Sequence, residues 1–163
     1  MAFDTFIKID GIEGESSDDK HAAWIEVISY DTGVNQKAST TASSAGGGSS
    51  ERADFDNFTF TKQLDKSSPK LAQACAAGTH IDTITMEICR AGAEKVKYME
   101  FIMTNCIISN YQVSGDGEDS FPIETIGINF GKIRWVYTVQ KRAGGVSAGN
   151  IATGWNLERN SKA

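Results

Sequence analysis

Few residues in this chain of 163 residues have the types and spacing that catalysis or metal binding requires. The three cysteines, Cys75, Cys89 and Cys106, form no C-x-x-C pair, so they predict neither a disulfide framework nor a zinc site. The two histidines, His21 and His80, form no H-x-x-x-H pair. We therefore expect no catalytic residue, no cofactor and no bound metal.

Three weaker sequence signals also favour structural roles over catalysis or ligand binding. The glycine run 46–48 is not followed by Lys-Ser or Lys-Thr, so it predicts a loop tip and not a phosphate-binding loop. The acidic turn 116–119 lacks the distal glutamate of a calcium loop and predicts a solvated turn. Cys75 and His80 could form a thiol–imidazole pair, but the expected position of Cys75 on an apolar helix face makes its thiol inert.

The charge and the apolar content of the sequence restrict the kinds of partner that this chain can bind. The formal net charge is −5 and the charges are scattered, which disfavours nucleic acid and anionic membranes. The sequence contains no apolar run of about 18 residues, so we expect no membrane insertion. Its N-terminus lacks the basic and apolar regions of a signal peptide, so we expect synthesis in the cytoplasm and export only by a route that reads no such signal.

Strand patterns dominate the chain, and only one segment predicts a helix. In that segment Ser68 is the expected cap, Pro69 the first helical residue and Gly78 the end, while Leu71 and Cys75 share the apolar face that packs on the β core. Gly131 is expected to bulge or bend the chain between the last two strands. The expected strands are 3–10, 23–30, 55–62, 81–90, 96–109 with a break near 104–105, 123–130 and 133–140.

This pattern indicates one mainly β domain spanning 1–163, either a β-sandwich or a β-barrel. Two segments do not fit a compact core. Residues 32–54 form a long loop without large apolar side chains, and residues 143–163 form a Gly-rich tail. The tail carries Trp155 and Leu157, and Trp155 could dock on its own domain or on a neighbouring copy.

Three stretches and the tail carry a family likeness. They read HAAWIEVISYDTGVNQ at 21–36, FTFTKQLDKSSPKLAQACAAGTHI at 58–81, PIETIGINFGKIRWVYTVQ at 122–140 and GWNLERN at 154–160. Together they resemble the Hcp family (haemolysin-coregulated protein), the tube protein of bacterial type VI secretion systems. The likeness runs in order along the whole chain, and the combination of its parts is more specific than any one of them.

The resemblance implies a β-barrel of two packed sheets with one short flanking α-helix. It implies a non-enzymatic subunit whose hexameric rings stack into a tube inside a contractile sheath, capped by a VgrG-like spike protein. The tube would be ejected by sheath contraction into the extracellular space or into target cells, and could carry effector proteins in its lumen. The alternative is a stand-alone secreted effector or adaptor protein.

A closed ring needs two different patches that meet on adjacent copies. The long loop and the tail are candidate sources of such patches, the loop either as an arm that orders against the next ring or as a disordered insertion. We expect Trp155 and Leu157 to anchor the tail. The expected ring-stacking residues of the loop are Thr32, Gln36, Ser39, Thr40, Ser43, Gly46, Gly47, Gly48 and Ser49.

Overall fold

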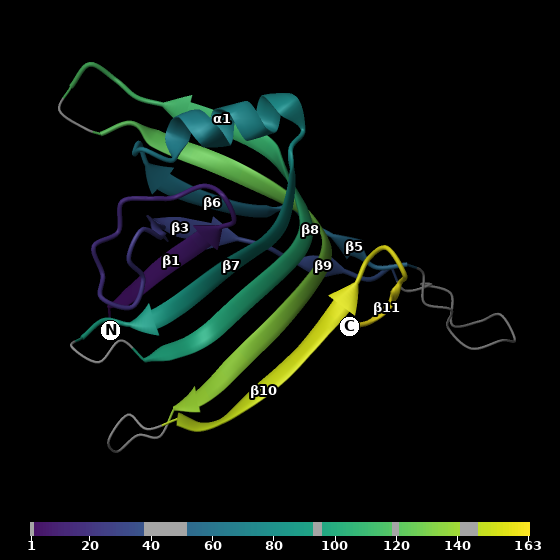
Figure 1. The fold of residues 1–163 in the computed structure, drawn as a ribbon. Coiled ribbons are helices and arrows are strands. Elements are labelled where there is room, and N and C mark those ends of the chain that lie inside the picture. Colours follow the sequence, from purple (N-terminus) through teal and green to yellow (C-terminus); the bar gives the residue numbers. More distant parts are fainter. Residues whose placement is uncertain (1, 38–51, 93–95, 119–120, 141–146) are drawn as a thin grey trace, which may run out of the picture.

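The computed structural model describes residues 2–37, 52–92, 96–118, 121–140 and 147–163 (Figure 1). These residues form eleven strands and one helix, which confirms the expected mainly β fold with a single short helix. In chain order the elements are β1 (Phe3–Ile9), β2 (Ile25–Glu26), β3 (Ser29–Asp31), β4 (Val34–Asn35), β5 (Asp54–Phe55), β6 (Phe58–Gln63), α1 (Ser68–Ala77), β7 (His80–Arg90), β8 (Lys97–Ser114), β9 (Ile123–Gln140), β10 (Ser147–Asn156) and β11 (Ser161–Lys162).

The main sheet is antiparallel and runs in the order β11-β10-β9-β8-β7-β1-β2. Strand β9 also belongs to a second layer, because its first half pairs with β6 and its second half pairs with β10. The long strands β8 and β9 curve across the whole molecule (Figure 1). Strand β3 lies on the far edge of β6. The two packed sheets therefore share β9 instead of being joined only by loops.

Residues 25–31 link the two sheets at their other side. The amide of Val27 donates to the carbonyl of Thr5 on β1 at 2.9 Å, and the next amide, Ile28, donates to the carbonyl of Thr61 on β6 at 2.8 Å. The segment therefore changes its hydrogen-bonding partner from β1 to β6 between these two residues. The prediction of one strand over 23–30 was therefore wrong in detail, since β2 and β3 are separate strands with different partners.

The apolar core lies between the sheets and the helix. Leu71 of α1 is fully buried in it, and half-buried Cys75 packs against it. Helix α1 ends at Gly78, which adopts the left-handed conformation at φ 61° as expected. The N-cap is Ser67 and not Ser68, whose hydroxyl instead donates to Glu124. Core side chains from the strands include Ile7, Ile9, Phe58, Phe60, Ile84, Met86, Met103, Ile126 and Ile128.

Two expected interruptions are absent from the described strands. Strand β9 runs unbroken through Gly131, which lies where β9 exchanges β6 for β10 as its partner. A Cβ at Gly131 would lie 2.5 Å from Glu158 Oε1 and 3.1 Å from the Cβ of Asn105, so a larger residue would require these side chains to shift. Strand β8 is also continuous, although Asn105 has a φ of 58°. The register shift between β8 and β9 lies instead between Ile108 and Asn110.

The C-terminal segment is ordered as a strand, which corrects the expectation of a Gly-rich tail. Strand β10 pairs with β9 from Ser147 to Asn156, with one register shift between Ser147 and Asn150. Gly154 makes this approach possible, because a Cβ there would lie 2.8 Å from the carbonyl oxygen of Ile133. Backbone pairing with β9 thus compensates for a composition that alone predicts little structure.

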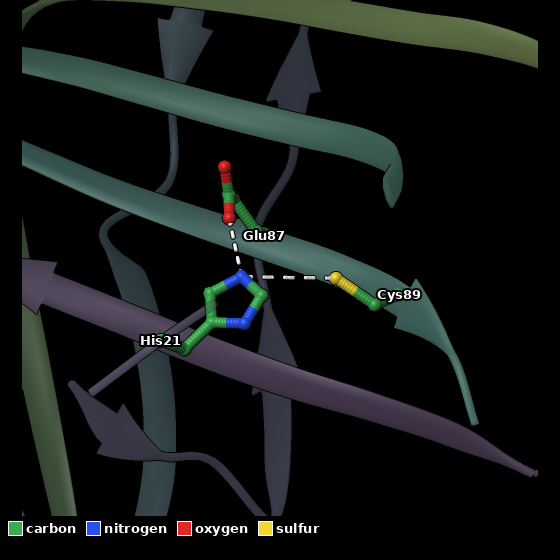
Figure 2. A group of neighbouring side chains, drawn as sticks. All are labelled: His21, Glu87 and Cys89. Carbon is green, nitrogen blue, oxygen red and sulfur yellow. Dashed lines mark hydrogen bonds and ion pairs between the residues drawn. The ribbon is translucent and has the colours of Figure 1, made fainter. Parts of the chain in front are cut away.

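A loop covers the face of β1 and β7 that points away from the core. His21 of this loop stacks on Phe6 of β1 with ring centroids 4.2 Å apart, and Trp24 packs edge-on against His21 at 4.8 Å. Figure 2 shows His21 directed at Glu87 and Cys89, which both lie on β7. The sheet is therefore buried on both faces at this place, with polar groups enclosed on the outer side.

Candidate assembly site

Strands β4 and β5 form a two-stranded stem at the base of the predicted loop. Val34 pairs with Phe55, and the amide of Asp56 donates to the carbonyl of Gly33 at 2.9 Å. The prediction of an unstructured segment over 32–54 was thus wrong at both of its ends. Thr32 is half-buried before the stem, and Gln36 is exposed after β4. The other expected stacking residues lie outside the described ranges: Ser39, Thr40, Ser43, Gly46, Gly47, Gly48 and Ser49.

The stem is fixed to the body through aromatic and backbone contacts. Phe55 lies 6.4 Å from Trp135 with nearly parallel rings, and 6.1 Å from Phe130 in an edge-on arrangement. The guanidinium of Arg52 donates to the carbonyl of Leu157 in the C-terminal segment. Figure 1 shows β5 beside the C-terminal end of the chain. The structure therefore brings the loop base and the tail together, although Arg52 and Leu157 are 105 residues apart in sequence.

A groove of about 510 Å³ lies between the stem and the C-terminal strands. Apolar side chains of both parts line it, with a cation at two places on its rim. Its lining residues are Val34, Gln36, Arg52, Ala53, Phe55, Trp135, Thr153, Gly154, Trp155, Asn160 and Lys162. The groove combines residues from the predicted loop and the predicted tail anchor.

The two tail-anchor residues differ in their surroundings. Leu157 packs against the apolar core, and its amide donates to the carbonyl of Gly131 at 2.8 Å. Trp155 is half-buried on β10 and lines the groove. Leu157 therefore holds the tail on its own domain, whereas Trp155 keeps part of its ring available to another molecule.

Among the exposed apolar side chains, two pairs lie on or beside separate strands. On β10, Ile151 is 66% exposed and stands in register with Tyr137 of β9, which is 44% exposed. On the other layer, Ile28 is 57% exposed and Tyr30 of β3 is 41% exposed. We call these the β10 edge and the β3 edge. They lie on different strands, with β10 in the main sheet and β3 paired with β6, and each carries one isoleucine and one tyrosine.

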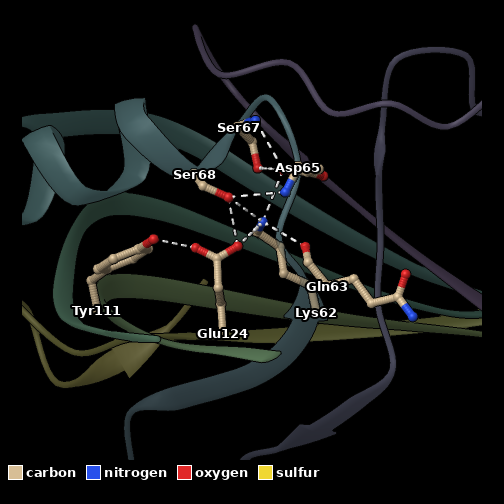
Figure 3. Close-up of polar contacts among 7 residues, drawn as sticks. All are labelled: Lys62, Gln63, Asp65, Ser67, Ser68, Tyr111 and Glu124. Atoms are coloured by element: carbon tan, nitrogen blue, oxygen red, sulfur yellow. Dashed lines mark hydrogen bonds and ion pairs between the residues drawn. The ribbon is translucent and has the colours of Figure 1, made fainter. Parts of the chain in front are cut away.

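A charged network lies inside the domain, beneath α1 (Figure 3). Lys62 of β6 and Glu124 of β9 are both fully buried, with Nζ 2.5 Å from Oε1. Lys62 also donates to Asp65 at 2.9 Å, and Ser68 of α1 donates to Glu124 at 2.6 Å. Tyr111 of β8 donates to the other oxygen of Glu124. The network therefore ties one helix to three strands.

The electrostatics of this network affect Tyr111 most clearly. Burial raises the pKa of Tyr111 to about 12, and the hydrogen bond to the Glu124 carboxylate acts in the same direction. The sequence motifs LDKSSP and P-x-E supply Asp65, Ser68 and Glu124, but their partnership joins segments 56 residues apart. Sequence reasoning singled out the motifs and missed the contact between them.

Comparison with known proteins places this architecture in a family. The model of the family described as "Type VI secretion system effector, Hcp" matches residues 6–137. Protein hcp1 of Pseudomonas aeruginosa is 34% identical over 164 residues, covering 100% of both chains. A solved structure described as that of a type six secretion system protein has a TM-score of 0.93 at 35% identity, covering 99% of this chain and 100% of that one. Hcp1 from Salmonella typhimurium has a TM-score of 0.82 at 30% identity, covering 100% of both.

These observations define a mainly β protein that exposes apolar side chains at the β10 edge and the β3 edge and has a groove between the β4–β5 stem and the C-terminal strands. With the matches above, they show that the chain belongs to the Hcp family of type VI secretion proteins, as the sequence motifs predict. Within the described ranges, no helix is long and apolar enough to cross a membrane.

Proposed function

We propose that this chain is a structural subunit of the type VI inner tube, with six copies closing a ring and rings stacking into the tube. The observation that carries this proposal is the pair of apolar edges that lie on different strands of the domain. Ile28 and Tyr30 mark one, and Ile151 and Tyr137 mark the other. A closed ring needs a head-to-tail interface in which one patch meets a different patch on the next copy.

The sheet edges favour the same arrangement. Strand β10 pairs with β9 on one side, while β11 covers its other side only at Trp155 and Asn156. Exposed strand edges invite pairing with another chain unless they are covered. A neighbouring copy that covers the β10 edge would bury Ile151 and Tyr137 and satisfy backbone groups of β10.

Ring closure is tested by placing a charge in one edge. We expect Ile151→Asp to leave a folded monomer, because a carboxylate in a packed apolar contact is costly. Val113→Asp is the matched control, since Val113 is 54% exposed on β8 and belongs to neither edge. Light scattering and negative-stain electron microscopy report the outcome. Rings from Ile151→Asp, or their loss in Val113→Asp, would contradict the proposed edge.

Stacking of rings is assigned to the arm that continues from the β4–β5 stem. Residues 39–50 contain no side chain larger than threonine, so they contribute little to a core. Replacing 39–50 by a two-residue Asn-Gly turn should preserve rings and abolish tubes and secretion. If tubes still form, the stacking contacts lie elsewhere. If the protein is insoluble or monomeric, the arm is needed for folding or for ring closure.

The assembled tube is proposed to act with three further partners. A VgrG-like spike protein caps it, a contractile sheath ejects it, and effector proteins travel in its lumen to the extracellular space or into target cells. The family membership supports these partners, because they belong to the same secretion machine. The alternative, a stand-alone secreted effector or adaptor protein, predicts compact monomers at every concentration together with unchanged secretion.

A further inference from the structure

Three side chains with metal-ligating atoms meet on the outer face of β7. The ligand atoms of His21, Glu87 and Cys89 all lie within 4.8 Å of one another (Figure 2). His21 and Cys89 are buried, and the Glu87 side chain is 14% exposed. These residues take no part in the edges or the groove described above. The cluster therefore needs its own explanation.

The fold explains why the three side chains converge. Glu87 and Cys89 are two residues apart on a strand, so they point to the same face, opposite to the core residues Met86 and Ile88. The loop that carries His21 is closely held, since the amide of Trp24 donates to the carbonyl of His21 at 3.1 Å. A rigid strand and a tightly turned loop thus position the three ligand atoms before any ion binds.

The distances are close to those of a zinc site. His21 Nε2 lies 2.6 Å from Glu87 Oε2 and 3.9 Å from Cys89 Sγ. Bond lengths of about 2.0 Å to nitrogen and oxygen and about 2.3 Å to sulfur place tetrahedral ligand atoms about 3.3 to 3.5 Å apart. To complete a coordination shell, the Nε2–Oε2 distance must lengthen by about 0.8 Å and the Nε2–Sγ distance must shorten by about 0.4 Å.

The surroundings of His21 match those of a metal-bound histidine. Its other ring nitrogen, Nδ1, lies 2.7 Å from Asp18 Oδ2, and such a carboxylate fixes the orientation of the ring. Lys97 lies 3.1 Å from Glu87 Oε1, which leaves Oε2 directed at the histidine. The carboxylates of Asp18, Glu87 and Glu100 outnumber the one ammonium of Lys97, which favours a cation.

We propose that His21 Nε2, Glu87 Oε2 and Cys89 Sγ form a zinc-binding site, with water as the fourth ligand. The ion replaces the thiol proton of Cys89 and any proton on Nε2, and both are released to solvent without a change of oxidation state. Bound zinc joins the loop of residues 10–24 to β7 and so stabilises the N-terminal side of the domain. The spacing of cysteines predicts no such site, because His21 and Glu87 are 66 residues apart.

Metal retention by the full chain tests the proposal. Protein stripped with a chelator is mixed with zinc chloride, dialysed and examined by native mass spectrometry. We expect one zinc per chain and a raised melting temperature for the unchanged protein, and loss of both for Cys89→Ser. Cys75→Ser and His80→Asn are the matched controls, because these residues lie away from the cluster, and both should retain zinc.

Cobalt binding supplies a second readout that a merely structural role of Cys89 would not change. Co²⁺ should give a thiolate-to-metal charge-transfer band in the unchanged protein and in Cys75→Ser, but none in Cys89→Ser. Asp18→Asn should weaken zinc binding about 10- to 100-fold, since Asp18 orients His21. Absence of retained zinc, or equal binding by Cys89→Ser with circular dichroism unchanged, would overturn the assignment.

Discussion

The Lys62–Glu124 network and the His21–Glu87 pair both bury charged groups, but they differ in exposure and in how they are attached. Side chains of β6, β8 and α1 contact Glu124 of β9, and Lys62 and Glu124 are both 0% exposed. The His21 and Glu87 side chains are 4% and 14% exposed, and Phe6 of β1 and Lys97 of β8 contact them. The interior network can open only when several elements separate, whereas the outer cluster can open with its loop alone.

This difference separates the structural role of the Lys62–Glu124 network from the metal-binding role proposed for His21, Glu87 and Cys89. Glu124 is fully buried and accepts hydrogen bonds from Lys62, Ser68 and Tyr111, which leaves it little capacity for another ligand. Glu87 points one oxygen at a histidine and lies next to a thiol, both of which can exchange a proton for a metal. Three variants test how far the comparison holds.

The largest effect is expected from Glu124→Ala. Removing the carboxylate leaves the Lys62 ammonium buried with one carboxylate partner, Asp65, and we expect a loss of about 3 to 5 kcal/mol in the free energy of unfolding. Urea titration followed by circular dichroism measures it. The double variant Lys62→Met with Glu124→Leu is the control and should recover most of the loss, because it removes both charges. A double variant as unstable as Glu124→Ala would show that packing, and not charge pairing, dominates.

A smaller loss is expected from His21→Ala. The substitution removes stacking on Phe6 and contacts to two carboxylates, and we expect about 1 to 3 kcal/mol with metal chelated. Hydrogen exchange should accelerate in the loop of residues 10–24 while β9 stays protected. His80→Ala is the control at an exposed site, expected within about 0.5 kcal/mol of the unchanged protein. Faster exchange throughout β9 would mean that the two regions open together.

The smallest effect concerns Tyr111 at alkaline pH. Its raised pKa, about 12 in the folded chain against 10.0 ordinarily, means that folding favours the protonated phenol. This stabilisation is fully present below pH 10 and is lost as pH rises towards about 12. Tyr111→Phe should therefore be less stable at neutral pH, and its stability should fall less steeply between pH 10 and 12. Parallel stability curves for the two proteins would contradict the shift.

Local sequence patterns predicted the strands and the helix whose formation depends on residues close together in the chain. Alternation identified β1 and β7, and the Pro69 and Gly78 signals placed the helix within one residue. Strand β10 was missed because its glycines carry no apolar pattern and its order comes from pairing with β9. The motifs containing Glu124 carried the family likeness, yet their contact with Lys62 spans 62 residues. No spacing rule along the chain reports such a contact.

The sequence was also insufficient to predict the contacts of the candidate assembly site. The sequence singled out Trp155 and Leu157, and only the fold separates a side chain packed on the core from one that lines a groove. The β4–β5 stem was missed because each strand has two residues, too few for alternation to be recognised.

The shared strand β9 also sets the order in which the molecule can be built. Phe58 of β6 pairs with Ile128 of β9, which is 70 residues later (128 − 58). A chain leaving the ribosome can form the β7–β8 hairpin early, but β6 joins the main sheet only after β9 has emerged. Such distant pairing slows folding and leaves apolar strands uncovered while synthesis continues. Newly made chains are therefore vulnerable to mispairing until nearly the whole sequence has been synthesised.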